Sequence, residues 1–139
     1  HIGGIVHNTK KNRLYGVSWG ARRFYQWDLS GQQIRMVLNH NHYVDYQDCQ
    51  YIGAHYMVAS GLSNYPAPGG GKFQLGGLDL IDLDTLHHVH LLPVIRYSNK
   101  DCILTNNPFY LESIEGGLRF YFAPDDNQTT IYIFDLIPD

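Results

Sequence analysis

The sequence predicts an all-β chain built from β-propeller blades, and three observations support this fold class. A strand-like run that ends in Asp-Leu occurs three times, at 24–29, 78–83 and 131–136. The aspartates of these runs are 54 and 53 residues apart, which is the spacing of a repeated supersecondary unit. No stretch of ten or more residues combines helical periodicity with helix caps. Four antiparallel strands per unit at this period are typical of propeller blades.

Length and composition indicate a single globular segment, residues 1–139. The chain is 44% hydrophobic, which is enough to form a core. A net charge of −3 leaves no basic stripe for nucleic acid, and no apolar run is long enough to span a bilayer. We therefore expect neither nucleic acid nor a membrane as partner. No signal-peptide pattern is present, but the chain opens inside a repeat, so secretion stays open.

The first expected blade covers about residues 1–42. Polar turns separate its strands, and apolar and polar side chains alternate in the last of them. We expect strands at 3–7, 14–19, 23–29 and 33–38.

The second expected blade, about 43–96, repeats this order with one insertion. Residues 63–71 are rich in Gly and Pro and end in three glycines, which predicts a surface loop between the second and third strands. We expect strands at 49–52, 56–60, 78–83 and 89–94.

The third expected blade, about 97–139, has strands at 109–112, 118–123 and 130–136, and no fourth strand follows. Three blades cannot close a ring, because propellers carry about four to eight. The chain is therefore expected to be half of a six-bladed propeller, completed by missing blades or by a second copy of the chain. A two-layered β-sandwich is the alternative fold, in which the repeat would reflect ancestral duplication only.

Four phrases carry a resemblance to a known family. They lie at 1–6, 16–20, 44–50 and 106–110. The chain resembles the C-terminal half of an uncharacterised family of bacterial and fungal propeller-like proteins, a domain of unknown function. That resemblance implies the propeller fold and longer relatives, and it implies no activity.

Polar residues precede the first strand of each expected blade. They are His1, then Asp45 and Asp48, then Asn107. The first strands line the channel of a propeller, so these groups could converge at its mouth. Carboxylates and amides suit a divalent cation such as calcium, with Asp48 and Asn107 as the candidate metal ligands, or a polyhydroxylated ligand. Alternatively, Asp and Asn end strands because their side chains bond the local backbone.

Two tyrosines near the expected channel mouth could stack on a sugar-like ligand: Tyr46 and Tyr110. The densest group of polar side chains is Asn39-His40-Asn41-His42. If this segment carries catalysis, His42 is the candidate general base, and Asp45 is the nearest carboxylate to orient it. A solvated loop between blades is the alternative interpretation of these histidines.

Three functional hypotheses follow. The first is a propeller segment whose channel mouth binds a small ligand or a divalent cation. The second is a metal-dependent hydrolase or lactonase; the candidate ligand set resembles that of six-bladed propellers of the regucalcin or gluconolactonase type. The third is a scaffold for protein interaction that uses the loops on the rim. The sequence leaves enzyme activity, and any cofactor, open.

Overall fold

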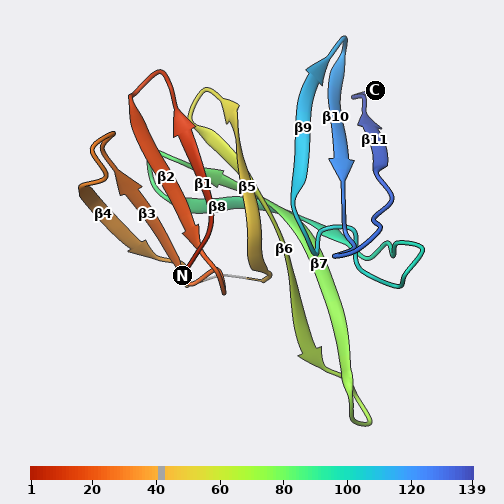
Figure 1. Ribbon diagram of the computed structural model, residues 1–139. Helices are drawn as coiled ribbons and strands as arrows, with labels where there is room; N and C mark the ends of the chain where they lie inside the picture. Colours follow the sequence, from red (N-terminus) through yellow and green to blue (C-terminus); the bar gives the residue numbers. More distant parts are fainter. Residues whose placement is uncertain (41–42) are drawn as a thin grey trace.

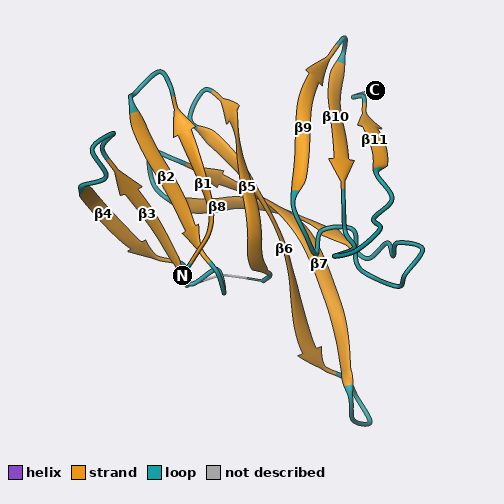
Figure 2. Ribbon diagram, in the orientation of Figure 1, coloured by secondary structure: helices purple, strands orange, loops and turns teal. Residues whose placement is uncertain are grey.

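The structure is a computed structural model that describes residues 1–40 and 43–139. All the regular elements in these two ranges are β-strands, and they form three antiparallel sheets (Figures 1 and 2). None of the described residues belongs to a helix that could cross a membrane. The first sheet has the strand order β1-β2-β3-β4. Its strands are β1 (Ile2–Asn8), β2 (Arg13–Ser18), β3 (Arg23–Trp27) and β4 (Gln33–Leu38).

The second sheet has the order β5-β6-β7-β8 and longer strands. They are β5 (Asp45–Gly53), β6 (Tyr56–Pro66), β7 (Lys72–Asp82) and β8 (His87–Val94). The prediction of a surface loop at 63–71 was wrong for residues 63–66, which belong to β6. β6 and β7 stay paired as far as Pro66 and Lys72, so the turn is only 67–71. Figure 1 shows this hairpin projecting beyond the other strands.

The third sheet has the order β11-β10-β9, with three strands among the described residues. They are β9 (Phe109–Ile114), β10 (Gly117–Phe122) and β11 (Tyr132–Leu136). In all three sheets, strands that are consecutive in sequence are neighbours in space. Each sheet is thus a meander, which is the strand order of a propeller blade.

The three sheets lie around a common side formed by their first strands. β5 contacts β1 on one side and β9 on the other, and Figure 1 shows β5 between them. This radial arrangement, with no helices among the described residues, confirms the predicted all-β propeller fold. β1, β5 and β9 all begin at the lower side of the view in Figure 1, which we call the entry face. The long β6–β7 hairpin projects from the same face.

Two apolar cores hold the sheets together. The first seam, between the first and second sheets, contains the fully buried side chains of Phe24, Tyr46 and Ile81. The second seam, between the second and third sheets, contains the buried Leu78 and Phe122. Burying one large apolar side chain of this kind contributes about 1.5–3 kcal/mol. The seams therefore fix the first strands, which begin at the entry face.

Strand β5 supplies side chains to both seams. Its pairing with β6 shifts register between Tyr46 and Asp48, so one extra residue, Gln47, is accommodated as a β-bulge. Tyr46 belongs to the core of the first seam, whereas Asp48 accepts a hydrogen bond from the backbone of β9 across the second seam.

Candidate functional site

A polar pocket opens on the entry face of the first sheet, and we call it the entry pocket. Its volume is about 550 Å³, within the range of about 300–1,000 Å³ usual for small-molecule sites. It is lined by His1, Ser18, Trp19, Arg22, Arg23, Tyr25, Leu38, Asn39 and His40. The pocket is formed where β2 and β4 end and β3 begins.

One hydroxyl group fixes the pocket's two arginines. β2 ends at Ser18, and the chain then turns through Gly20 and Ala21, both with positive φ. The Ser18 Oγ accepts hydrogen bonds from the backbone N–H of Arg22 at 3.1 Å and of Arg23 at 2.9 Å. Because Ser18 is buried, these bonds hold the backbone of the loop while the arginine side chains stay exposed. We call residues 18–23 the arginine loop.

Asn39 joins the arginine loop to the end of β4. Its backbone N–H donates to the Arg22 carbonyl at 2.9 Å, and its side-chain Nδ2 donates to the Ala21 carbonyl at 2.9 Å. The Asn39 side chain is buried, so both carbonyls are satisfied away from water.

The electrostatic character of the entry pocket is cationic. Arg22 and Arg23 are exposed, His1 and His40 add imidazoles, and none of the described residues that line the pocket is acidic. Guanidinium groups present paired donors that match carboxylate and phosphate oxygens. Trp19 is 54% exposed and lies edge-on to His1 with ring centroids 5.9 Å apart. The pocket therefore offers anion-binding donors beside an aromatic surface.

Of the residues singled out from the sequence, His1 lines the entry pocket, and the Asp45 Oδ1 lies 4.0 Å from where a Cβ on Gly20 of the arginine loop would be. Asp45 begins β5, and its backbone N–H donates to the Ser63 Oγ at 3.0 Å. His42 lies outside the described residues, so its predicted role as a general base stays a prediction. Asn107 donates from Nδ2 to the Pro124 carbonyl at 2.7 Å and to Asp126 Oδ1 at 2.9 Å.

Asp48 lies in the second seam and caps backbone amides. Its Oδ1 accepts from the Cys49 N–H at 2.8 Å, and its Oδ2 accepts from the Phe109 N–H at 3.4 Å. Burial raises the pKa of the Asp48 carboxyl, and the two amide bonds oppose that rise. In the part of the chain that the structure describes, no three His, Cys, Asp or Glu side chains are grouped to hold a metal ion. Metal binding by Asp48 and Asn107 stays a prediction.

The two tyrosines singled out for stacking have different surroundings. Tyr46 is fully buried, and its hydroxyl donates to Asp79 inside the first seam. Tyr110 is 55% exposed on β9, with its ring 5.9 Å from that of Tyr121. Only Tyr110 presents its ring to solvent in a way that a ligand could reach.

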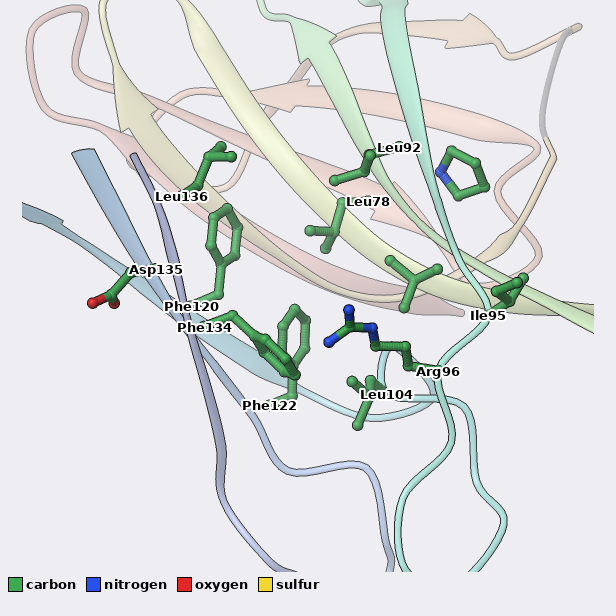
Figure 3. A pocket seen from close by; sticks show the side chains of 12 residues that line it. Leu78, Leu92, Ile95, Arg96, Leu104, Phe120, Phe122, Phe134, Asp135 and Leu136 are labelled. Carbon is green, nitrogen blue, oxygen red and sulfur yellow. The ribbon is translucent and has the colours of Figure 1, made fainter. Parts of the chain in front are cut away.

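A second hollow lies between the second and third sheets (Figure 3). Its volume is about 440 Å³, and apolar side chains dominate its lining. It is lined by Leu78, Leu92, Pro93, Val94, Ile95, Arg96, Leu104, Phe120, Phe122, Phe134, Asp135 and Leu136. The Arg96 guanidinium lies over the Phe134 ring, 5.3 Å from its centroid. We call this hollow the apolar groove; it continues the second core toward the surface.

Reasoning from the sequence missed the residues that give the entry pocket its charge. Arg22 and Arg23 follow a Trp-Gly-Ala turn, and two adjacent arginines at a strand start were a visible signal. From the sequence, we considered residues that precede the first strand of each blade, whereas Arg22 precedes and Arg23 begins a third strand.

Comparisons with known proteins agree with the fold. The profile of a family of unknown function, DUF6454, matches residues 1–138, which confirms the resemblance to a propeller-like domain of unknown function. Hydrazine synthase from Kuenenia stuttgartiensis is similar in structure, with 9% identity, a TM-score of 0.57 and coverage of 97% of this chain and 34% of that one. The soluble aldose sugar dehydrogenase from Escherichia coli in the apo form gives 10% identity, a TM-score of 0.55 and coverage of 92% and 38%.

This chain spans little more than a third of the length of those two proteins. A search of curated proteins gave no match.

Proposed function

Since the chain belongs to the DUF6454 family of unknown function and has a propeller fold, we propose that its entry pocket binds a small anionic, polyhydroxylated molecule such as a sugar acid. The observation that carries this proposal is the pair Arg22 and Arg23, held by the Ser18 hydroxyl in a pocket whose described lining has no carboxylate. Sequence reasoning placed a small ligand at the channel mouth, and the entry pocket lies on the face where the first strands begin.

Charge and shape favour this class of ligand. Hydrogen bonds from a guanidinium to a carboxylate contribute about 1.5–3 kcal/mol when they are shielded from water, and less at an exposed rim. Arg22 and Arg23 are exposed, so we expect an affinity in the micromolar to millimolar range. The Trp19 face can stack on the apolar face of a sugar ring. The aldose sugar dehydrogenase acts on sugars by its name, and at 10% identity it lends support only through the shared fold.

The other functional hypotheses have weaker support. A cation bound by Asp48 would have to compete with the amides of Cys49 and Phe109 for the same two oxygens. A metal-dependent hydrolase or lactonase also needs His42, which lies outside the described residues. A scaffold role through the rim would use the projecting β6–β7 hairpin, away from the charged groups of the entry pocket.

The test compares glucuronate with glucose, which differ in the carboxylate. Isothermal titration should give a dissociation constant for glucuronate and little heat for glucose. Arg22→Gln should weaken glucuronate binding about tenfold, which corresponds to about 1.4 kcal/mol. The double variant Arg22→Gln/Arg23→Gln should abolish it.

Arg13→Gln is the matched control, because Arg13 begins β2 at the end opposite the pocket and should leave binding unchanged. Equal affinities for glucuronate and glucose, an unaltered affinity in the double variant, or no glucuronate binding at millimolar concentration would each reject the proposal.

A further inference from the structure

A buried row of polar side chains crosses the first seam and ends at the arginine loop. The hydroxyl of Tyr46 donates to Asp79, and the Asn39 Nδ2 donates to that same hydroxyl oxygen at 3.3 Å. Tyr46 is fully buried and Asp79 is 1% exposed, so water does not compete for these bonds. Asn39 also donates to the Ala21 carbonyl, which places the arginine loop at one end of the row.

At its other end the row reaches the outer strand of the second sheet. The Nδ1 of His88, on β8, is 3.5 Å from the Asp79 Oδ1. Both atoms are buried and have no hydrogen-bond partner. The His88 side chain is 22% exposed, and its ring stacks on Tyr43 with centroids 5.6 Å apart. His88 is therefore the member of the row that can exchange a proton with solvent.

We propose that Asp79, Tyr46 and His88 are positioning residues for the entry pocket, and that the protonation state of His88 adjusts the arginine loop through Asp79, Tyr46 and Asn39. The link from this row to ligand affinity rests on the proposed function. The coupling between His88 and the loop is a property of the protein alone, and it can be measured without a ligand.

The direction of the hydrogen bonds follows from the charge of Asp79. A carboxylate accepts and cannot donate, so the Tyr46 hydroxyl must donate to it, and the Tyr46 oxygen is left to accept from Asn39. Burial, reinforced by Asp79, raises the pKa of Tyr46 well above its usual value, so the phenol keeps its proton. The row thus has one hydrogen-bond polarity when Asp79 is ionised.

Protonation of His88 changes the electrostatic interaction between its Nδ1 and the Asp79 carboxylate. A protonated Nδ1–H can donate to the Asp79 Oδ1, whereas an Nδ1 lone pair facing that oxygen repels it. Among the described residues, the groups that act electrostatically on Asp79 are Tyr46, His88 and His90, and the Tyr43 ring covers His88. Burial raises the pKa of Asp79, and its hydrogen bond from Tyr46 and the charges of the two histidines oppose that rise.

The experiment follows amide and imidazole resonances by ¹H–¹⁵N NMR between about pH 5 and pH 8, the range in which histidine titrates. We expect the backbone amides of Arg22 and Arg23 to shift with the midpoint of the His88 imidazole. That component should vanish in His88→Gln and in Tyr46→Phe. Tyr46→Phe removes one oxygen and keeps the buried ring, and its retained amide dispersion verifies the fold.

The coupling would be overturned if the chemical shifts of the loop amides showed no inflection at the pH midpoint of the His88 resonance. It would also be overturned if that inflection persisted in Tyr46→Phe. His1 and His40 also line the pocket, but both variants leave them in place, so only the lost component is assigned to His88.

A second measurement uses glucuronate as the probe. Between about pH 7.5 and pH 5.5, affinity should increase about threefold more in the wild type than in His88→Gln. Equal pH profiles would overturn the link to the pocket. An absence of glucuronate binding would count against the proposed function alone, and the NMR titration would then decide the coupling by itself.

Discussion

The two seams of the molecule join neighbouring first strands in different ways. In the first seam, β1 approaches the backbone of β5 directly. A Cβ on Gly3 would lie 2.6 Å from the Tyr46 carbonyl oxygen, and one on Gly4 would lie 2.7 Å from the Cys49 nitrogen. Glycine is required there because no side chain fits between the two strands.

In the second seam, side chains span the gap between first strands. The Gln50 Nε2 donates to the Phe109 carbonyl at 3.0 Å, and the Leu111 N–H donates to the Gln50 Oε1 at 3.0 Å. Asp48 accepts from the Phe109 N–H beside them. The first strands of the first seam are thus joined by close contact of their backbones. Those of the second seam are joined by the amide side chain of Gln50 and the carboxylate of Asp48, which substitution can remove. The apolar groove lies in the second seam.

The largest expected effect comes from filling the close contact of the first seam. Gly4→Ala places a methyl group against the backbone and Sγ of Cys49, which cannot move without shifting β5. We expect the free energy of unfolding to fall by about 3 kcal/mol, the upper part of the usual range for overpacking. Urea denaturation followed by tryptophan fluorescence measures it.

Ile5→Val is the matched control on the same strand, because Ile5 is 57% exposed and its loss of one methylene should have little effect. If Gly4→Ala proved as stable as this control, the two strands would not be in close contact.

A smaller effect is expected from cutting the side-chain bridge of the second seam. Gln50→Leu keeps the volume but leaves the Phe109 carbonyl and the Leu111 N–H without their partner. We expect a loss of about 1–2 kcal/mol, because these groups are only partly buried. Hydrogen exchange should quicken in β9 and remain unchanged in β1. Gln33→Leu, on the exposed start of β4, is the control. Equal losses of stability in both variants would show that the Gln50 bridge does not stabilise the second seam.

The smallest expected effect is a pH dependence of the second seam. The pKa of Asp48 is raised in the folded state, mainly by burial, so the folded protein binds the proton more tightly than the unfolded chain. The contribution of protonated Asp48 to the free energy of unfolding is therefore fully present below the unfolded pKa of 3.8. It is lost as pH rises through the raised pKa of the folded state. Wild type should gain stability relative to Asp48→Asn as pH falls toward that window. A difference that is constant with pH would contradict the assigned pKa direction.

Much of the fold could be predicted because alternation and turn chemistry are local. The strand expected at 33–38 is β4, and the others in the first and third sheets were located to within about two residues. Residues 63–66 were misjudged because the Gly and Pro residues of 63–71 suggested a loop, and only 67–71 forms the turn. Pairing to β7 overrides that preference, and the stacked rings of Tyr65 and Phe73 help to hold it.

The candidate site was less predictable because it depends on which residues a loop brings together. His1 was found, but the arginine loop owes its geometry to the Ser18 hydroxyl and to Asn39, which come from the ends of β2 and β4. Tyr46 and Asp48 have the spacing of residues on one face of a regular strand, yet they serve opposite seams. A sequence pattern alone does not reveal such a change of side.

The single extra residue at Gln47 explains that division and has a consequence for how the chain tolerates change. Because Tyr46 pairs with Gly61 and Asp48 with the adjacent Ser60, deleting Gln47 would leave these pairings in place and would keep the Tyr46 phenol facing Asp79. The faces of Tyr46 and Asp48 should therefore survive both substitution and removal of residue 47. The pairing of Tyr46 with Gly61, more than the chemistry of residue 47, thus keeps the arginine-bearing blade connected to the interior of its neighbour.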